Sequence, residues 1–164
     1  MQAKEVVKIA LRSTQDTLQM FLNDLSDKDL TARPVPSANN IAWQLAHLIM
    51  AEKFLLLGEL PGVNYPEAPA AIAALGSERT GKVEPAEGYL GKAQYLEWFG
   101  KMRAATIAAV DKLSDADLDK TVTNMMAQHA PTLGALLILT ANHTLMHGGQ
   151  FTVIRRALGK PVIF

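Results

Sequence analysis

The sequence predicts an all-α protein, a four-helix bundle with a long crossover connection between its second and third helices. Apolar residues recur at the helical period in four long segments. No segment shows the alternating, β-branched pattern of a strand, and a stretch rich in Gly, Pro and Ala separates the two middle helices. With 164 residues, the chain suits one domain, which we expect to span residues 1–164.

The first half of the chain predicts two helices joined by a turn and a loop. Apolar residues at helical spacing indicate a first helix over Ala3–Leu25. Ser26 can cap a short helical turn, SDKDL, and the segment ARPVPSANN that follows has the prolines of a loop. A second helix is predicted over about Asn40–Leu57. One side of this helix carries Trp43, His47, Met50 and Phe54.

The second half of the chain predicts the crossover and two further helices. Gly58–Pro85 has weak periodicity and is expected to form the long connection, with a short helix around Ala68–Leu75. A third helix is predicted over about Lys92–Leu113. The fourth begins near Thr132, a suitable N-cap, and runs to about Leu158, after which a glycine and a proline end it.

A short pattern occurs twice in the chain. LSDKDL at Leu25–Leu30 resembles LSDADL at Leu113–Leu118, and each follows a long helix and precedes a helix that carries histidine. Two interpretations are open. The pattern can indicate a duplicated helix pair, or it can be a capping pattern that recurs by chance.

Composition argues against several classes of function. Lys plus Arg and Asp plus Glu both number 16, and the basic residues are scattered, so we expect no nucleic-acid partner. The absence of cysteine rules out disulfides, zinc–thiolate sites and a cysteine nucleophile, and it makes the cytoplasm the expected location. No membrane partner is expected, because the apolar stretch Leu133–Ala141 is far shorter than the roughly 20 residues of a membrane span.

Histidines on two predicted helices are the main candidates for chemistry. His143 and His147 are four residues apart, so they project from one face of one helix and can reach a single metal ion. His47, on a different helix, would complete a set of three nitrogen donors that suits zinc, nickel, iron or copper. The residues alone leave open the alternative that these are core histidines held by hydrogen bonds.

Two segments, WQLAHLIMAE and NHTLMHGGQFTVIRRALGKP, resemble the DinB/YfiT-like superfamily, which is distinct from the DNA polymerase that shares the DinB name. The resemblance extends over essentially the whole chain. Its most specific part is the HxxxHxGQ pattern from His143 to Gln150, together with the placement of His47. It implies a four-helix bundle that binds a divalent metal ion, commonly zinc or nickel, with His47, His143 and His147 as ligands. It also implies a possible homodimer.

Other residues near these histidines have open roles. Gln150 could orient a ligand or hydrogen-bond a buried carbonyl, and His129 could be a proton carrier or a solvated loop residue. Glu52 is expected at the surface, with a place beside a metal ligand as the alternative. Gly148 and Gly149 each cost a helix about 1 kcal/mol relative to alanine, so we expect close packing to compensate.

One motif is rejected. GSERTGK at Gly76–Lys82 matches the GxxxxGK pattern of phosphate-binding loops. Such a loop needs Ser or Thr at the next position, and Val83 stands there instead. It also needs a buried strand before it, whereas AAIAAL precedes this one. We therefore expect a flexible polar loop.

The sequence favours a metal-dependent enzyme that acts on a small molecule. The resemblance implies thiol S-transferase chemistry, and without a cysteine of its own the protein would need a low-molecular-weight thiol as cosubstrate. Metal-dependent hydrolysis is the alternative activity that the resemblance offers. A non-catalytic bundle that binds a metal or small molecule, and a metal-free interaction domain, are the remaining interpretations.

Overall fold

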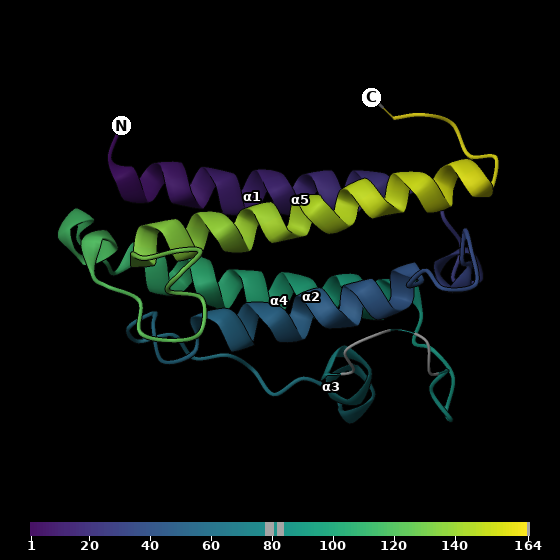
Figure 1. Cartoon of the computed structure of the whole chain (residues 1–164), viewed down its shortest axis with the longest axis horizontal. Coiled ribbons are helices and arrows are strands. Elements are labelled where there is room, and N and C mark those ends of the chain that lie inside the picture. Colours follow the sequence, from purple (N-terminus) through teal and green to yellow (C-terminus); the bar gives the residue numbers. More distant parts are fainter. Residues whose placement is uncertain (78–80, 82–83, 164) are drawn as a thin grey trace.

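Four long helices form the body of the molecule (Figure 1). They are α1 (Ala3–Leu22), α2 (Ile41–Leu56), α4 (Lys92–Asp111) and α5 (Leu133–Ala157). Three short helical elements connect them, namely η1 (Asp29–Thr31), α3 (Ala70–Ser77) and η2 (Asp115–Asp119). The computed structural model describes residues 1–77, 81 and 84–163. The predicted all-α bundle is confirmed.

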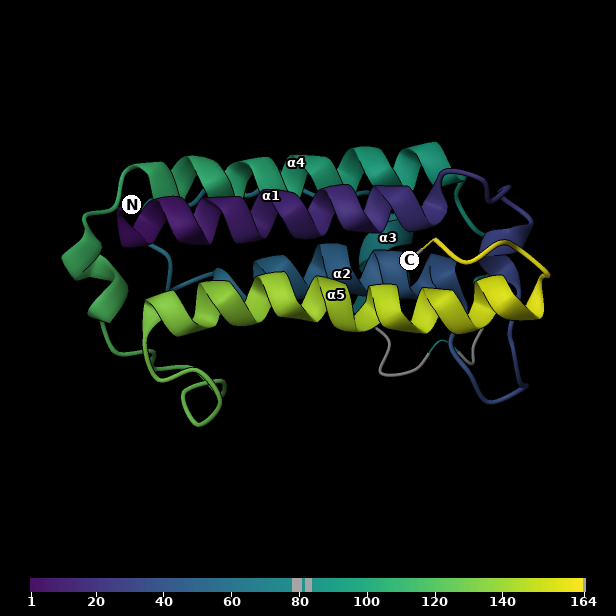
Figure 2. The same cartoon turned by 90° about the horizontal axis from the view of Figure 1, so that it is seen from above.

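The long helices pack as a square. α1 contacts α4 and α5, and α2 contacts the same two helices. α1 and α5 run in one direction, and α2 and α4 run in the other (Figures 1 and 2). Because α2 and α4 are parallel, the chain must return along the bundle between them, which explains the length of the crossover. α3 lies within this crossover and packs against α2.

Side chains and a glycine cap the helix ends, and two of these caps, Thr132 and Gly159, were predicted. The Asn40 side chain accepts a hydrogen bond from the backbone nitrogen of Trp43 at 2.9 Å and caps α2. Thr132 caps α5 by accepting from the nitrogen of Ala135 at 3.3 Å. After α5, Gly159 has a φ of 68°, a left-handed conformation that glycine adopts without strain.

Both copies of the LSDxDL pattern form the same capped turn. The backbone nitrogen of Ser26 donates to the Asp29 carboxylate at 2.8 Å, and that of Ser114 donates to Asp117 at 2.8 Å. α1 ends at Leu22, before the predicted end at Leu25, because the buried Leu25 already belongs to the first of these turns. Local capping accounts for the repeated pattern, and the duplication of a helix pair stays a prediction.

The two glycines in α5 differ. A Cβ atom at Gly148 would lie 3.5 Å from the ring of Phe21 on α1, so the two helices approach closely there, as predicted. Gly149 is exposed, and a Cβ atom there would meet nothing within 4 Å. The expectation of close packing is therefore wrong for Gly149.

Strand structure in the described part of the chain is confined to one isolated bridge between Thr121 and Thr132. None of the helices in those same ranges has both the length and the apolar character that a membrane crossing requires. The predicted polar loop at Gly76–Lys82 lies largely outside the described residues, although its first two residues end α3.

A buried arginine links all four long helices. The Nε atom of Arg103, on α4, donates to both carboxylate oxygens of Glu52 on α2 at 3.0 Å. Its Nη1 atom donates to the Leu11 carbonyl and, at 3.1 Å, to Thr14 on α1. Its Nη2 atom donates to Thr144 on α5 at 3.0 Å. One guanidinium therefore fixes the positions of the other three helices around α4.

The expected surface position of Glu52 is wrong. Its side chain is only 2% exposed and accepts a further hydrogen bond from the Thr106 hydroxyl at 2.6 Å. A carboxylate can be buried at this position because Arg103 and Thr106 satisfy its oxygens. The sequence gives no sign of this pairing, since Arg103 lies 51 residues away in the chain.

We expect replacement of Arg103 by methionine to lower the free energy of unfolding by about 3–5 kcal/mol, because it leaves the Glu52 carboxylate buried without a charged partner. The double variant R103M/E52Q should recover part of this loss. Urea unfolding followed by circular dichroism measures both effects. Lys101→Met, which removes an exposed ion pair with Glu97 on the same helix, is the control and should change stability little. An R103M variant as stable as this control would contradict the role of the network.

Candidate metal centre

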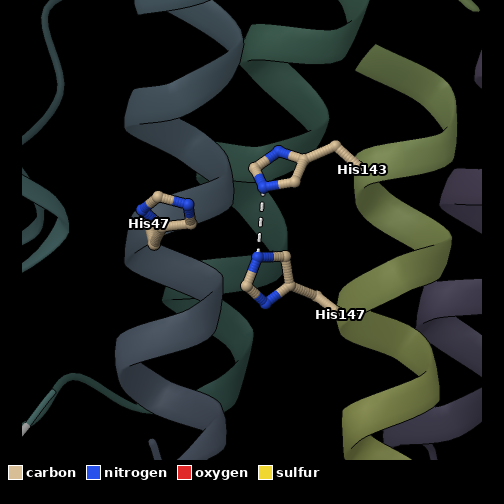
Figure 3. A group of neighbouring side chains, drawn as sticks. All are labelled: His47, His143 and His147. Carbon is tan, nitrogen blue, oxygen red and sulfur yellow. Dashed lines mark hydrogen bonds between the residues drawn. The ribbon is translucent and has the colours of Figure 1, made fainter. Parts of the chain in front are cut away.

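Three histidine side chains from two helices converge inside the bundle. His47 extends from α2 toward His143 and His147, which lie one turn apart on α5 (Figure 3). The centre of the His47 ring lies 5.2 Å from that of each of the other two, and those two centres are 4.8 Å apart. One nitrogen of each ring lies within 4.8 Å of the others.

The two histidines of α5 have nitrogens at a spacing that one metal ion can bridge. Nε2 of His143 lies 3.2 Å from Nε2 of His147, the contact dashed in Figure 3. Two nitrogens bound to one tetrahedral zinc ion, with bonds of about 2.0–2.1 Å, lie roughly 3.3 Å apart. The observed pair is therefore close to the distance that a shared ion requires.

Gln44 orients one of these rings. Its Oε1 atom lies 2.9 Å from Nδ1 of His147, and its amide nitrogen donates to the Asn39 carbonyl at 3.2 Å. With the amide oxygen turned toward the ring, Nδ1 of His147 carries the proton and donates it, so Nε2 has a free lone pair directed at His143. Two facing lone pairs at 3.2 Å would repel each other. The contact therefore needs either a proton on Nε2 of His143, which then donates a hydrogen bond to His147, or a cation between the two rings.

His47 is held by groups from α2 and the crossover. The Trp43 ring stacks on the imidazole with centres 4.9 Å apart and planes 9° apart. The imidazole also hydrogen-bonds to the backbone of Gly76, at the end of α3. α3 can approach this closely only because Gly76 has no side chain, since a Cβ atom there would lie 2.3 Å from the backbone oxygen of Ala46. A glycine of the crossover thus helps to orient a histidine of the bundle.

The three rings are neutral at pH 7. Burial and, as a smaller cause, the nearby His47 lower the pKa of His143 to about 4. Burial and the two neighbouring rings lower the pKa of His147 to about 3. Burial also lowers the pKa of His47, against the opposing effect of its hydrogen bond to Gly76. Neutral imidazole is the form that binds metal ions, so the three rings are in the protonation state that coordination requires.

A cavity of about 520 Å³ opens beside the cluster, a volume typical of small-molecule sites. His47 and His143 line it, whereas the buried His147 is turned toward Gln44. Any open position of an ion held by the cluster would therefore be reached from the side of His47 and His143. The other walls are Ala51, Phe54, Leu55, Met126, Leu139, Asn142 and Met146.

The remaining candidates from the sequence lie elsewhere. Gln150 is exposed on α5, outside the histidine cluster, and its role in orienting a ligand stays a prediction. His129 is exposed in the loop before α5 and is not part of the cluster. The residues that orient the ligand rings, Gln44 and Gly76, were not predicted. Gln44 lies three residues before His47, and this helical spacing places the two on one face, so the sequence could have indicated it as a neighbour of the cluster. A backbone carbonyl such as that of Gly76 has no sequence signature.

Comparisons with known proteins agree with the fold. The sequence model of the DinB superfamily matches residues 10–151, a range that includes all three histidines. No curated protein matches the sequence. The crystal structure of a conserved protein from Enterococcus faecalis superimposes with a TM-score of 0.69 at 15% identity, over 98% of this chain and 99% of the other. At that identity the likeness shows the fold alone. The family match covers most of the sequence, and the chain therefore belongs to the DinB superfamily.

Proposed function

We propose that the protein binds one divalent metal ion on His47, His143 and His147 and uses it in catalysis on a small molecule. The observation that carries the proposal is the convergence of three neutral ring nitrogens beside a cavity of substrate size. A bound zinc or nickel ion would supply Lewis acidity toward a thiol, a water molecule or a carbonyl group of the substrate.

The surrounding residues support this function by orienting the ligands. Gln44 selects the tautomer of His147 that leaves Nε2 free, and Gly76 and Trp43 hold the ring of His47. Such partners commonly raise metal affinity, because they remove the need to order the ligand when the ion binds. Burial excludes protons from the rings, as the lowered pKa values of His143 and His147 indicate.

Thiol S-transfer is the activity that we place first. The described cavity walls contain no Asp, Glu or Lys that could serve as a general base, and the two histidines there are assigned to the metal. The nucleophile must therefore lose its proton with little help from side chains. A thiol starts from a pKa of about 8–9, whereas water starts from about 15.7 and depends on the ion to bring its pKa to about 7. Since the chain has no cysteine, the thiol would come from a cosubstrate.

Two alternatives remain and differ in what they require. A metal-dependent hydrolase would use the same ligands but would depend on the ion alone to activate water. In a non-catalytic protein, the ion would chiefly hold α2 and α5 together. Thiol transfer differs from hydrolysis in that an electrophile is turned over only when a thiol is added. Binding of a small molecule without any turnover would indicate the non-catalytic protein.

We expect the purified, tag-free protein to contain or take up about one zinc or nickel ion per chain, measured by elemental analysis after mild chelation and refilling. His47→Ala and His143→Ala should each weaken metal binding on the order of a hundred-fold, because two histidines hold an ion loosely. Competition with a chromophoric chelator measures this affinity.

His129→Ala is the matched control for these variants, because it removes an exposed histidine outside the cluster. It should bind metal as the unaltered protein does. If His47→Ala also retained full affinity, the ligand set would be wrong. If the unaltered protein took up no metal, the interaction-domain interpretation would be favoured.

Gln44→Leu should lower metal affinity about 10- to 100-fold, because the ring of His147 loses the acceptor that orients it. The same chelator competition measures the effect. Gln150→Leu is the control, since it makes the same change at an exposed position on α5. Equal affinities for the two variants would rule out a positioning role for Gln44.

Gly76→Ala should weaken metal binding and destabilise the fold, because the added Cβ would lie 2.3 Å from a backbone oxygen of α2 and force α3 away from His47. Gly149→Ala places the same group in open space, so it should keep metal affinity and slightly raise the thermal midpoint. Calorimetry and chelator competition on both variants test this contrast. Unchanged metal affinity in Gly76→Ala would show that α3 does not position His47.

A further inference from the structure

The cavity beside the histidine cluster has a chemical character that limits what it can bind. We propose that it takes an uncharged small molecule, which packs an apolar body between α2 and α5 and directs a polar group at His47 and His143. This inference rests on the metal site proposed above and names the class of substrate that the site accepts.

The walls provide no partner for a charge. Among the described residues that line the cavity, none is Asp, Glu, Lys or Arg, and Asn142 is the only polar residue besides the two histidines. A carboxylate, phosphate or ammonium group placed against these walls would lose hydration without gaining an ion pair. Away from the histidine cluster, the cavity therefore disfavours charged groups, and an anionic group would find a partner only in an ion held by the cluster.

Two large apolar side chains of the wall are exposed to solvent. Phe54 is 65% exposed and Met146 is 58% exposed, on α2 and α5 respectively. They stand on the two sides of the cavity that also contains His47 and His143. Large apolar groups gathered around a concavity typically mark a binding site, because a ligand that covers them removes apolar surface from water. Methionine in such a wall adapts its shape to different ligands.

The position of the histidines orients the bound molecule. His47 and His143 contribute to the cavity wall, while His147 is buried and bonded to Gln44. A ligand in the cavity would thus meet the cluster at one end and apolar side chains along its length. In the proposed thiol transfer, the cavity would therefore bind the uncharged acceptor of the thiol. A thiol that carries carboxylate or ammonium groups fits these apolar walls less well.

The test uses the full chain loaded with cobalt(II), whose visible spectrum reports ligands at the metal. Titration with imidazole and with 4-phenylimidazole compares the same metal-binding group without and with an apolar body. We expect 4-phenylimidazole to bind on the order of ten- to a hundred-fold more tightly than imidazole, because its phenyl ring is buried in the cavity. A 4-phenylimidazole that carries a carboxylate on the phenyl ring should lose most of this advantage.

Met146→Gln should reduce the advantage of 4-phenylimidazole over imidazole several-fold, while cobalt content and imidazole affinity stay the same. Leu145→Gln is the matched control, since Leu145 is the neighbouring residue, is 44% exposed and does not line the cavity. It should leave the advantage intact.

The outcomes separate this inference from the proposed function. A chain that holds cobalt but binds both imidazoles equally, or prefers the carboxylate form, would overturn the inference and leave the metal site standing. An equal loss in Met146→Gln and Leu145→Gln would also overturn it, because the effect would then not come from the cavity. A chain that takes up no cobalt overturns the proposed function and this inference with it.

Discussion

The structure depends on the burial of one positive charge at the centre of the bundle. A guanidinium that has lost its water must find acceptors in fixed directions, and Arg103 finds them on α1, α2 and α5. Two of these partners lie close in sequence to residues of the histidine cluster. Glu52 lies five residues after His47, and Thr144 is next to His143. The hydrogen bonds of Arg103 therefore set the register in which α2 and α5 face each other, and with it the spacing of the histidines.

The crossover also has a part in the site. In a bundle with parallel middle helices, a long connection is a topological necessity. Within it, the glycine of α3 brings a backbone carbonyl against α2 and within reach of His47. The geometry of the cluster thus depends on three groups of residues: the histidines on α2 and α5, the groups that orient them, and the buried ion pair of Arg103 and Glu52.

Sequence reasoning succeeded where the signal is local. Periodicity located the long helices, and Thr132 and Gly159 marked the ends of α5 because capping depends on neighbouring residues. The HxxxH spacing brought His143 and His147 together for the same reason. The predictions for Glu52 and Gly149 failed, because burial of a carboxylate and open space beside a glycine depend on distant segments. The apolar wall of the cavity is likewise a product of tertiary packing.

The long reach of Arg103 has a consequence for folding kinetics. Helical bundles usually fold quickly, because most of their contacts are local in sequence. The bonds from Arg103 to Thr144, Glu52 and Leu11 join residues 41, 51 and 92 positions apart, so several loops must close before the guanidinium finds all its acceptors. Because these closures cost entropy, we expect the bonds of Arg103 to form late, after the rate-limiting step. The hydrogen bonds of the buried charge should then slow unfolding of the bundle more than they speed its folding.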